Sequence, residues 1–211
     1  MDKALKKFQK MNSRMPERLI IFRDGVGDKQ LRAISEQEIT QIKSALKELG
    51  LAEKVGFIYV SVCKRINTRI FASGELEDSY KNPVPGLVVN SAITEKEPAY
   101  KEFYLVSTSS RQGMTKPTRY TIAYDSLGAP QEYLELLTYK LCHSYFNVAG
   151  SISVPAPVQY AHKLAAMVGD RAGGTAAAFT RDGTMITTGT QPGLPPVMHE
   201  RFEELPGLYY I

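Results

Sequence analysis

The stretch "RLIIFRDGVGD", residues 18–28, decides how the rest of the chain is interpreted. It begins with an apolar run, which predicts a buried strand over residues 18–22. Two aspartates and two glycines then fall within five residues, 24–28. Asp24 therefore has two interpretations: a turn residue, or a metal ligand at the strand end, where α/β sheets bind their ligands.

Strand and helix patterns alternate after this stretch. Ser35 and Glu38 match a capping box, an apolar stripe follows them, and Gly50 predicts the end of the helix. A second apolar run predicts a strand over residues 54–62. The order strand, loop, helix, strand predicts a parallel α/β unit.

The remaining elements are shorter. Strands are expected over residues 68–71, 86–90, 102–108 and 119–125, and helices are expected to open at Pro130 and Pro157. Residues 171–205 are rich in Gly, Thr and Pro, which predicts an irregular loop insertion. The apolar, aromatic residues 206–211 predict a docked C-terminal tail. His143 has apolar neighbours and is expected to pack in the core.

Composition limits the class of protein. The 211 residues, 43% of them hydrophobic, suit one domain with a real core. No apolar run approaches the length of a membrane span, and the N-terminus carries no secretory signal pattern, so no membrane partner is expected. Cys63 and Cys142 lack metal-ligand spacing and are expected to be reduced core thiols.

The net charge of +4 is modest, but its distribution is uneven. Eight Lys and Arg residues lie in three segments that contain no Asp or Glu. The segments are those between residues 54 and 75, 102 and 125, and 135 and 170. The eight bases are Lys64, Arg65, Arg69, Arg111, Lys116, Arg119, Lys140 and Lys163. A face that binds a polyanion needs such segments, although chance clustering is the alternative.

Two loops and one histidine could carry chemistry. The loop around Lys64, Arg65 and Arg69 holds three cations in six residues, and a second loop combines Gln112, Lys116 and several hydroxyls. Both suit phosphate contacts; solvated loop charges are the alternative. His162 lies in the first turns of the predicted final helix and is either a ligand or an ordinary hydrogen-bonded histidine. There is no nucleophile elbow, Walker loop or Cys-x-x-Cys pair.

Five blocks together resemble the C-terminal part of the PIWI domain of Argonaute-family proteins, in order and spacing. They are "IIFRDGVGDKQL" (20–31), "KRINTRIF" (64–71), "FYLVST…RQGMTKPTRYTIAYD" (103–125), "LTYKLCHSYFN" (137–147) and "VPAPVQYAHKLA" (154–165). The second and fourth look more like the Piwi clade. The resemblance spans about residues 15–169 and the final "LYYI". It implies an α/β, ribonuclease-H-like PIWI fold.

The resemblance implies that the chain binds a guide small RNA of the piRNA kind and a target RNA in gene silencing. Members that cut the target use two divalent ions, Mg²⁺ or Mn²⁺, held by Asp, Glu, Asp and His, because hard cations prefer carboxylate oxygens. Asp24 matches the second of these aspartates, and His162 matches the histidine. Both are therefore expected to be catalytic and metal-ligating.

Other positions match guide-backbone contacts of the family. The expected RNA-binding residues are Lys64, Arg65, Arg69, Gln112, Lys116, Tyr145, Ser153 and the terminal carboxylate of Ile211. Asn147 and Met167 stand where the family often has basic residues. The contacts that those bases would make are not expected here.

The family's first catalytic aspartate, its glutamate and its PAZ and MID modules would precede Met1. We therefore expect a single partial PIWI domain, incomplete at its N-terminal side, that does not cleave RNA unaided. Three hypotheses remain. The first is an enzyme, if a longer chain supplies the missing Asp and Glu, and the second is a non-catalytic RNA-binding or scaffold module. The third is an unrelated phosphate-binding α/β domain. The family implies a cytoplasmic location, in perinuclear or germ granules, or a nuclear one.

Overall fold

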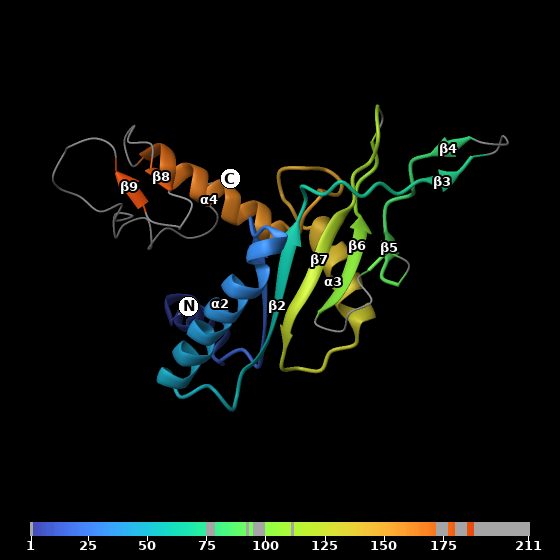
Figure 1. Ribbon diagram of the computed structural model, residues 1–211. Helices are drawn as coiled ribbons and strands as arrows, with labels where there is room; N and C mark the ends of the chain where they lie inside the picture. The colour runs from blue at the N-terminus through green and yellow to red at the C-terminus, as the bar shows by residue number, and fades with distance from the viewer. Residues whose placement is uncertain are drawn as a thin grey trace. The chain divides into compact units, whose positions relative to one another are not determined.

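The computed structural model describes residues 2–74, 79–91, 93–94, 100–110, 112–171, 177–179 and 185–187 (Figure 1). The chain divides into two units, Met1–Ala156 and Pro157–Ile211. The first unit carries a mixed sheet with helices. The second contains most of the last long helix and a short strand pair.

A five-stranded sheet forms the frame of the first unit, in the order β1-β2-β7-β6-β5. Its strands are β1 (Arg18–Asp24), β2 (Gly56–Cys63), β5 (Leu87–Val89), β6 (Lys101–Val106) and β7 (Thr118–Asp125). β1 and β2 are parallel, and the other neighbouring pairs are antiparallel. The expected parallel β-α-β unit is confirmed, with α2 (Asp28–Glu48) as its crossover helix.

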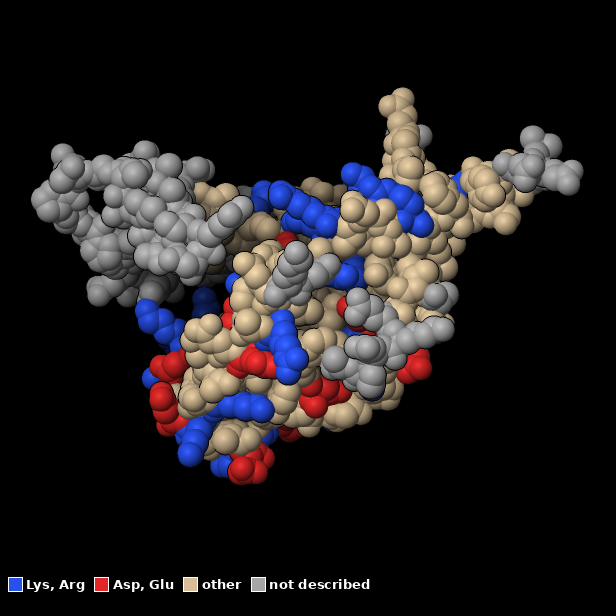
Figure 2. Space-filling view, in the orientation of Figure 1, with Lys and Arg blue, Asp and Glu red and all other residues tan. Residues whose placement is uncertain are grey.

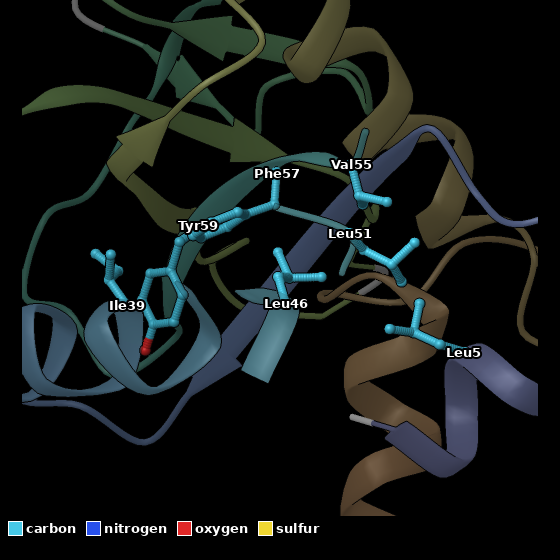
Figure 3. Close-up of a cluster of buried hydrophobic side chains, with 7 residues drawn as sticks. All are labelled: Leu5, Ile39, Leu46, Leu51, Val55, Phe57 and Tyr59. Atoms are coloured by element: carbon cyan, nitrogen blue, oxygen red, sulfur yellow. The ribbon is translucent and has the colours of Figure 1, made fainter. Parts of the chain in front are cut away.

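Both faces of β2 are covered. Phe57 and Tyr59 pack with Ile39 and Leu46 of α2 in a buried cluster (Figure 3). Leu5 of α1 (Asp2–Asn12) belongs to the same cluster. The alternate residues of β2, on the other face, are also buried: Ile58, Val60 and Val62. A strand buried on both faces is typical of a central position, and it explains the nearly continuous apolar run in the sequence.

Helix α2 begins at Asp28, seven residues before the predicted capping box. Ser35 is therefore inside the helix, where its hydroxyl donates to the carbonyl oxygens of Leu31, at 2.5 Å, and Arg32, at 3.2 Å. The predicted helix start at Ser35 is wrong because the serine bonds back to the preceding turn instead of capping the next one. Glu38, the other half of the predicted box, is engaged in tertiary contacts.

The predicted strand over residues 68–71 is also wrong. The guanidinium of Arg69 donates to the carbonyl oxygens of Ile66 and Thr68, at 2.8 Å each, so its own side chain holds this backbone in a loop. The strand pairing begins just afterwards, as a separate pair of β3 (Ala72–Ser73) and β4 (Tyr80–Lys81).

Helix α3 (Gln131–Cys142) contacts β6 and buries Leu134. It ends one residue before His143, which is exposed. Nδ1 of His143 lies 3.0 Å from the carbonyl oxygen of Tyr139, and the two rings meet edge to face. The prediction that His143 packs in the core is wrong because the residue falls beyond the last turn of the helix.

Beyond residue 156 the structure describes α4 (Ala156–Arg171), β8 (Ala177–Phe179) and β9 (Met185–Thr187). β8 and β9 are antiparallel, so the irregular loop expected over residues 171–205 contains a strand pair. The other residues of that loop after Arg171, and the predicted docked tail 206–211, lie outside the described residues. No helix in the described part of the chain is long and apolar enough to cross a membrane.

Candidate nucleic-acid interface

Asp24 is the last residue of β1, at the strand end where it was expected. Its register partner is Val62 of β2, and Lys64 follows the end of β2. Because parallel strands end at the same edge of the sheet, the two side chains meet: Nζ of Lys64 lies 3.1 Å from Oδ2 of Asp24. The other carboxylate oxygen, Oδ1, accepts a hydrogen bond from the N–H of Gly25 at 2.7 Å. Gly25 has a φ of +85°, which favours glycine.

A polar network formed by Arg23, Glu38 and Tyr59 anchors this strand end to α2. Nε of Arg23 donates to both oxygens of Glu38, at 2.9 and 3.2 Å, and Nη1 donates to the carbonyl oxygen of Asp24 at 2.6 Å. The Tyr59 hydroxyl donates to Glu38 at 2.5 Å. Burial, and then the Glu38 carboxylate, raise the pKa of Tyr59 above its ordinary value. The network holds the backbone of Asp24 in place.

A crevice of about 390 Å³ lies at the same edge of the sheet. β7 runs antiparallel to β2, so its first residue, Thr118, lies near the end of β2. The lining residues share small size, hydroxyl groups or positive charge: Lys64, Thr108, Ser109, Ser110, Met114, Thr115, Lys116, Pro117, Thr118 and Ser153. This lining contains no acidic side chain.

The chemistry of the crevice suits an anion. Two ammonium groups, Lys64 and Lys116, line it beside several hydroxyl donors. The Thr115 hydroxyl is buried and has no hydrogen-bond partner among the described residues. Buried hydroxyls in native proteins almost always have a hydrogen-bond partner, so this one is available as a donor to a ligand or a water molecule. Charge-assisted hydrogen bonds from such groups are the usual means of holding phosphate.

Side-chain hydrogen bonds join the walls of the crevice. The hydroxyl of Thr118 donates to the carbonyl oxygen of Ser153 at 2.7 Å, and that of Ser107 donates to Ile152 at 2.7 Å. On the other side, Asn82 donates to the carbonyl oxygen of Gly113 at 2.8 Å and accepts from the N–H of Thr115 at 3.0 Å. Hydrogen bonds within the chain thus hold both walls of the crevice.

Figure 2 shows Lys and Arg side chains gathered over the end of the sheet where β2 stops and β7 starts. Arg65 is exposed beside Lys64 in the sequence. Arg119, which follows Thr118, is half-buried, and burial lowers its pKa from the ordinary value. The basic, acid-poor segments of the sequence therefore supply one edge of the sheet.

The structure brings together some of the predicted site residues and not others. It joins Asp24, Lys64, Lys116 and Ser153 at one sheet edge. Arg69 has its guanidinium turned to its own loop. His162 is exposed on α4, in the second unit, so its pairing with Asp24 stays a prediction.

Three other predicted RNA-binding residues have more limited placements. Tyr145 is buried and has its hydroxyl 3.5 Å from Nδ2 of Asn147. Gln112 is exposed, and its backbone carbonyl accepts from Ser110. Ile211 lies outside the described residues.

Sequence reasoning missed Thr108 of the crevice and the whole Arg23–Glu38–Tyr59 network. Thr108 lies in an acid-free basic segment, which was the available signal. The network had none, because Glu38 was assigned to a capping box and the three residues are far apart in sequence.

The described residues do not by themselves fit a divalent ion. Among them, no three His, Cys, Asp or Glu side chains gather as metal ligands. The Lys64 ammonium lies 3.1 Å from Oδ2 of Asp24 and would repel a metal ion at the same oxygen. Asp24 remains a suitable hard ligand, but a metal site would need further carboxylates.

A mixed sheet flanked by helices places the chain among α/β domains, and its basic, acid-free crevice beside a strand-end carboxylate suits an anionic ligand. Comparison with known proteins identifies the family, because the Piwi domain family matches residues 1–172. The chain belongs to this family.

Individual relatives are also Piwi-family proteins. The chain is 45% identical over 166 residues to Piwi-like protein Ago3 of Bombyx mori, covering 79% of this chain and 18% of that protein. It is 40% identical over 171 residues to the protein aubergine of Drosophila melanogaster, and the match covers 79% of this chain and 19% of that protein. The chain therefore spans about a fifth of the length of these relatives.

Solved structures show the same fold. The crystal structure of Drosophila Piwi matches with a TM-score of 0.71 and 39% identity, over 80% of this chain and 23% of that one. Kluyveromyces polysporus Argonaute, crystallised with a guide RNA, matches with a TM-score of 0.65 and 27% identity. That match covers 78% of this chain and 20% of the other. The fold is thus that of part of a PIWI domain, as the sequence motifs implied.

Proposed function

We propose that this chain binds the phosphate backbone of a guide small RNA, of the piRNA kind, as part of a Piwi-family protein acting in RNA-guided silencing. One observation carries the proposal: an acid-free crevice at the basic edge of the sheet, lined by two lysines and by the buried hydroxyl of Thr115, which has no hydrogen-bond partner among the described residues. Family membership supports RNA as the polyanion, and one similar Argonaute was crystallised with a guide RNA.

The residues of the crevice would contribute charged and neutral hydrogen-bond donors. Lys64 and Lys116 supply charge to phosphate oxygens, and the Thr115 hydroxyl supplies a neutral donor. Arg65, exposed next to Lys64, extends the positive surface beyond the end of β2. Such contacts are insensitive to base identity, so the bases of the guide remain available to pair with a target RNA.

Cleavage of the target is a separate proposal. With the ligands that the structure describes, we expect the chain to bind RNA without cutting it. In a longer protein, other segments would have to supply carboxylates beside Asp24 before Mg²⁺ or Mn²⁺ could bind there. Such a protein would be an endoribonuclease of the cytoplasm or nucleus, and its PAZ and MID modules would hold the guide ends.

Fluorescence anisotropy with a 5′-phosphorylated single-stranded RNA tests the binding proposal. Lys116→Gln should weaken binding and lower the slope of log affinity against log salt by about 0.7, the value for one lost phosphate contact on a single strand. Lys101→Gln is the matched control, because Lys101 is exposed at the start of β6, away from the crevice. Equal effects of the two substitutions would refute a role for the crevice.

A further inference from the structure

Lys64 takes part in both the ion pair with Asp24 and the lining of the crevice. Its ammonium lies 3.1 Å from Oδ2 of Asp24, and the same residue lines the crevice with Lys116 and Thr115. This double membership follows from topology: β1 and β2 are parallel and in register, whereas the crevice is built on the other side of β2 by the start of β7.

The two partners of this ion pair differ in freedom. Asp24 is held firmly, because the Gly25 N–H binds its Oδ1 and Arg23 binds its backbone carbonyl. Its side chain is 13% exposed. The Lys64 side chain is 36% exposed and is a flexible four-carbon stem with three donors. Lys64, and not Asp24, is therefore the partner that can turn toward a ligand in the crevice.

We propose that the Asp24 carboxylate and an RNA phosphate compete for the Lys64 ammonium. This inference rests on the proposed function. A phosphate that approaches the crevice meets a neutral Asp24–Lys64 pair instead of a free cation, so Asp24 restrains RNA affinity. When phosphate takes Lys64, the Oδ2 atom of Asp24 becomes available to another cation.

The competition gives Asp24 a role that needs no metal. With Lys64 at its Oδ2 atom and no group of three metal-ligating side chains among the described residues, Asp24 does not by itself hold a divalent ion. Coupling between the two anions is reciprocal: whatever draws Lys64 to the crevice weakens its hold on Asp24 by the same factor.

A double-mutant cycle measures this coupling without divalent ions. The affinity of a labelled oligouridylate is compared for the full chain, Asp24→Asn, Lys64→Met and the double variant, in EDTA. Asp24→Asn should tighten binding by about threefold, the scale of a partly exposed ion pair, and Lys64→Met should weaken it. In the Lys64→Met background, Asp24→Asn should have no effect, because the contested ammonium is gone.

The control variant is Glu36→Gln. It also removes one acid and releases one cation, Arg32, whose Nε lies 3.1 Å from Glu36 on the exposed surface of α2. Its effect on RNA affinity should be the same with Lys64 or Met at position 64. An equal gain from Asp24→Asn in both backgrounds would mean general repulsion of RNA by the carboxylate and would overturn the competition, as would no gain in either.

A second measurement uses the unaltered chain and does not depend on the folding of variants. The ¹³C carboxyl resonance of Asp24 should shift when oligouridylate is added, as Lys64 leaves it. RNA binding without that shift overturns the competition and leaves the proposed function standing. Failure of the unaltered chain to bind RNA at all overturns both.

Discussion

Glu38→Ala tests the polar network that anchors the strand end of Asp24. Tyr59 is 0% exposed and its hydroxyl donates to Glu38, so the substitution removes the acceptor of a buried donor. Stranding a buried hydroxyl costs about 1–3 kcal/mol. The Arg23–Glu38 pair is 42% and 29% exposed, so solvent screens it, and its loss adds at most about 1 kcal/mol. We expect the free energy of unfolding to fall by about 2–3 kcal/mol.

Urea unfolding followed by circular dichroism measures this loss. With a slope of about 2 kcal/mol per molar urea, the midpoint should fall by about 1–1.5 M. Tyr59→Phe gives the sharper test, because its sign should depend on the background. In the unaltered chain it removes a good hydrogen bond and costs about 1 kcal/mol, whereas in Glu38→Ala it removes a stranded hydroxyl and restores about as much.

The matched control is Tyr133→Phe, since Tyr133 is 54% exposed on α3. It should change stability by less than about 0.5 kcal/mol in both backgrounds. If Tyr59→Phe destabilised the unaltered chain and Glu38→Ala equally, the Tyr59–Glu38 hydrogen bond would contribute nothing, and the account of the network would be refuted.

Three further predictions concern other parts of the first unit. Asn82→Ala breaks both hydrogen bonds to Gly113 and Thr115; amide exchange over residues 113–115 should accelerate and RNA affinity should fall, and unchanged exchange would contradict the clamp. Leu134→Ala, at a side chain that is 1% exposed, should cost about 2–5 kcal/mol in urea unfolding, whereas Leu136→Ala, at 53% exposed, should cost far less. Burial raises the pKa of Cys142 to about 11; the folded thiol holds its proton longer than the unfolded one, so this stabilising contribution is complete below about pH 8.5 and is lost as the pH rises toward about 11. Cys142→Ala should flatten that part of the stability–pH curve, and an unchanged curve would contradict the assignment.

Much of the architecture was predictable because it depends on local periodicity. The apolar run before Asp24, the helical stripe after it and the second apolar run define β1, α2 and β2 without any tertiary information. Errors arose where one side chain had two local options. Ser35 could cap a helix or bond back within one, and Arg69 could extend a strand or hold its own loop. The structure has the second option in both cases, through hydrogen bonds to backbone carbonyl oxygens three or four residues earlier.

The sequence by itself determined the strand-helix-strand opening, the strand-end position of Asp24 and, through five ordered motifs, membership of the Piwi family. Only the tertiary structure decided which distant residues meet. The parallel register of β1 and β2 sets Lys64 against Asp24, and the antiparallel return of β7 brings Lys116 and Thr118 to the same edge. The physical reason is that periodicity shows which face of an element is buried, whereas pairing between elements depends on the packing of the whole sheet.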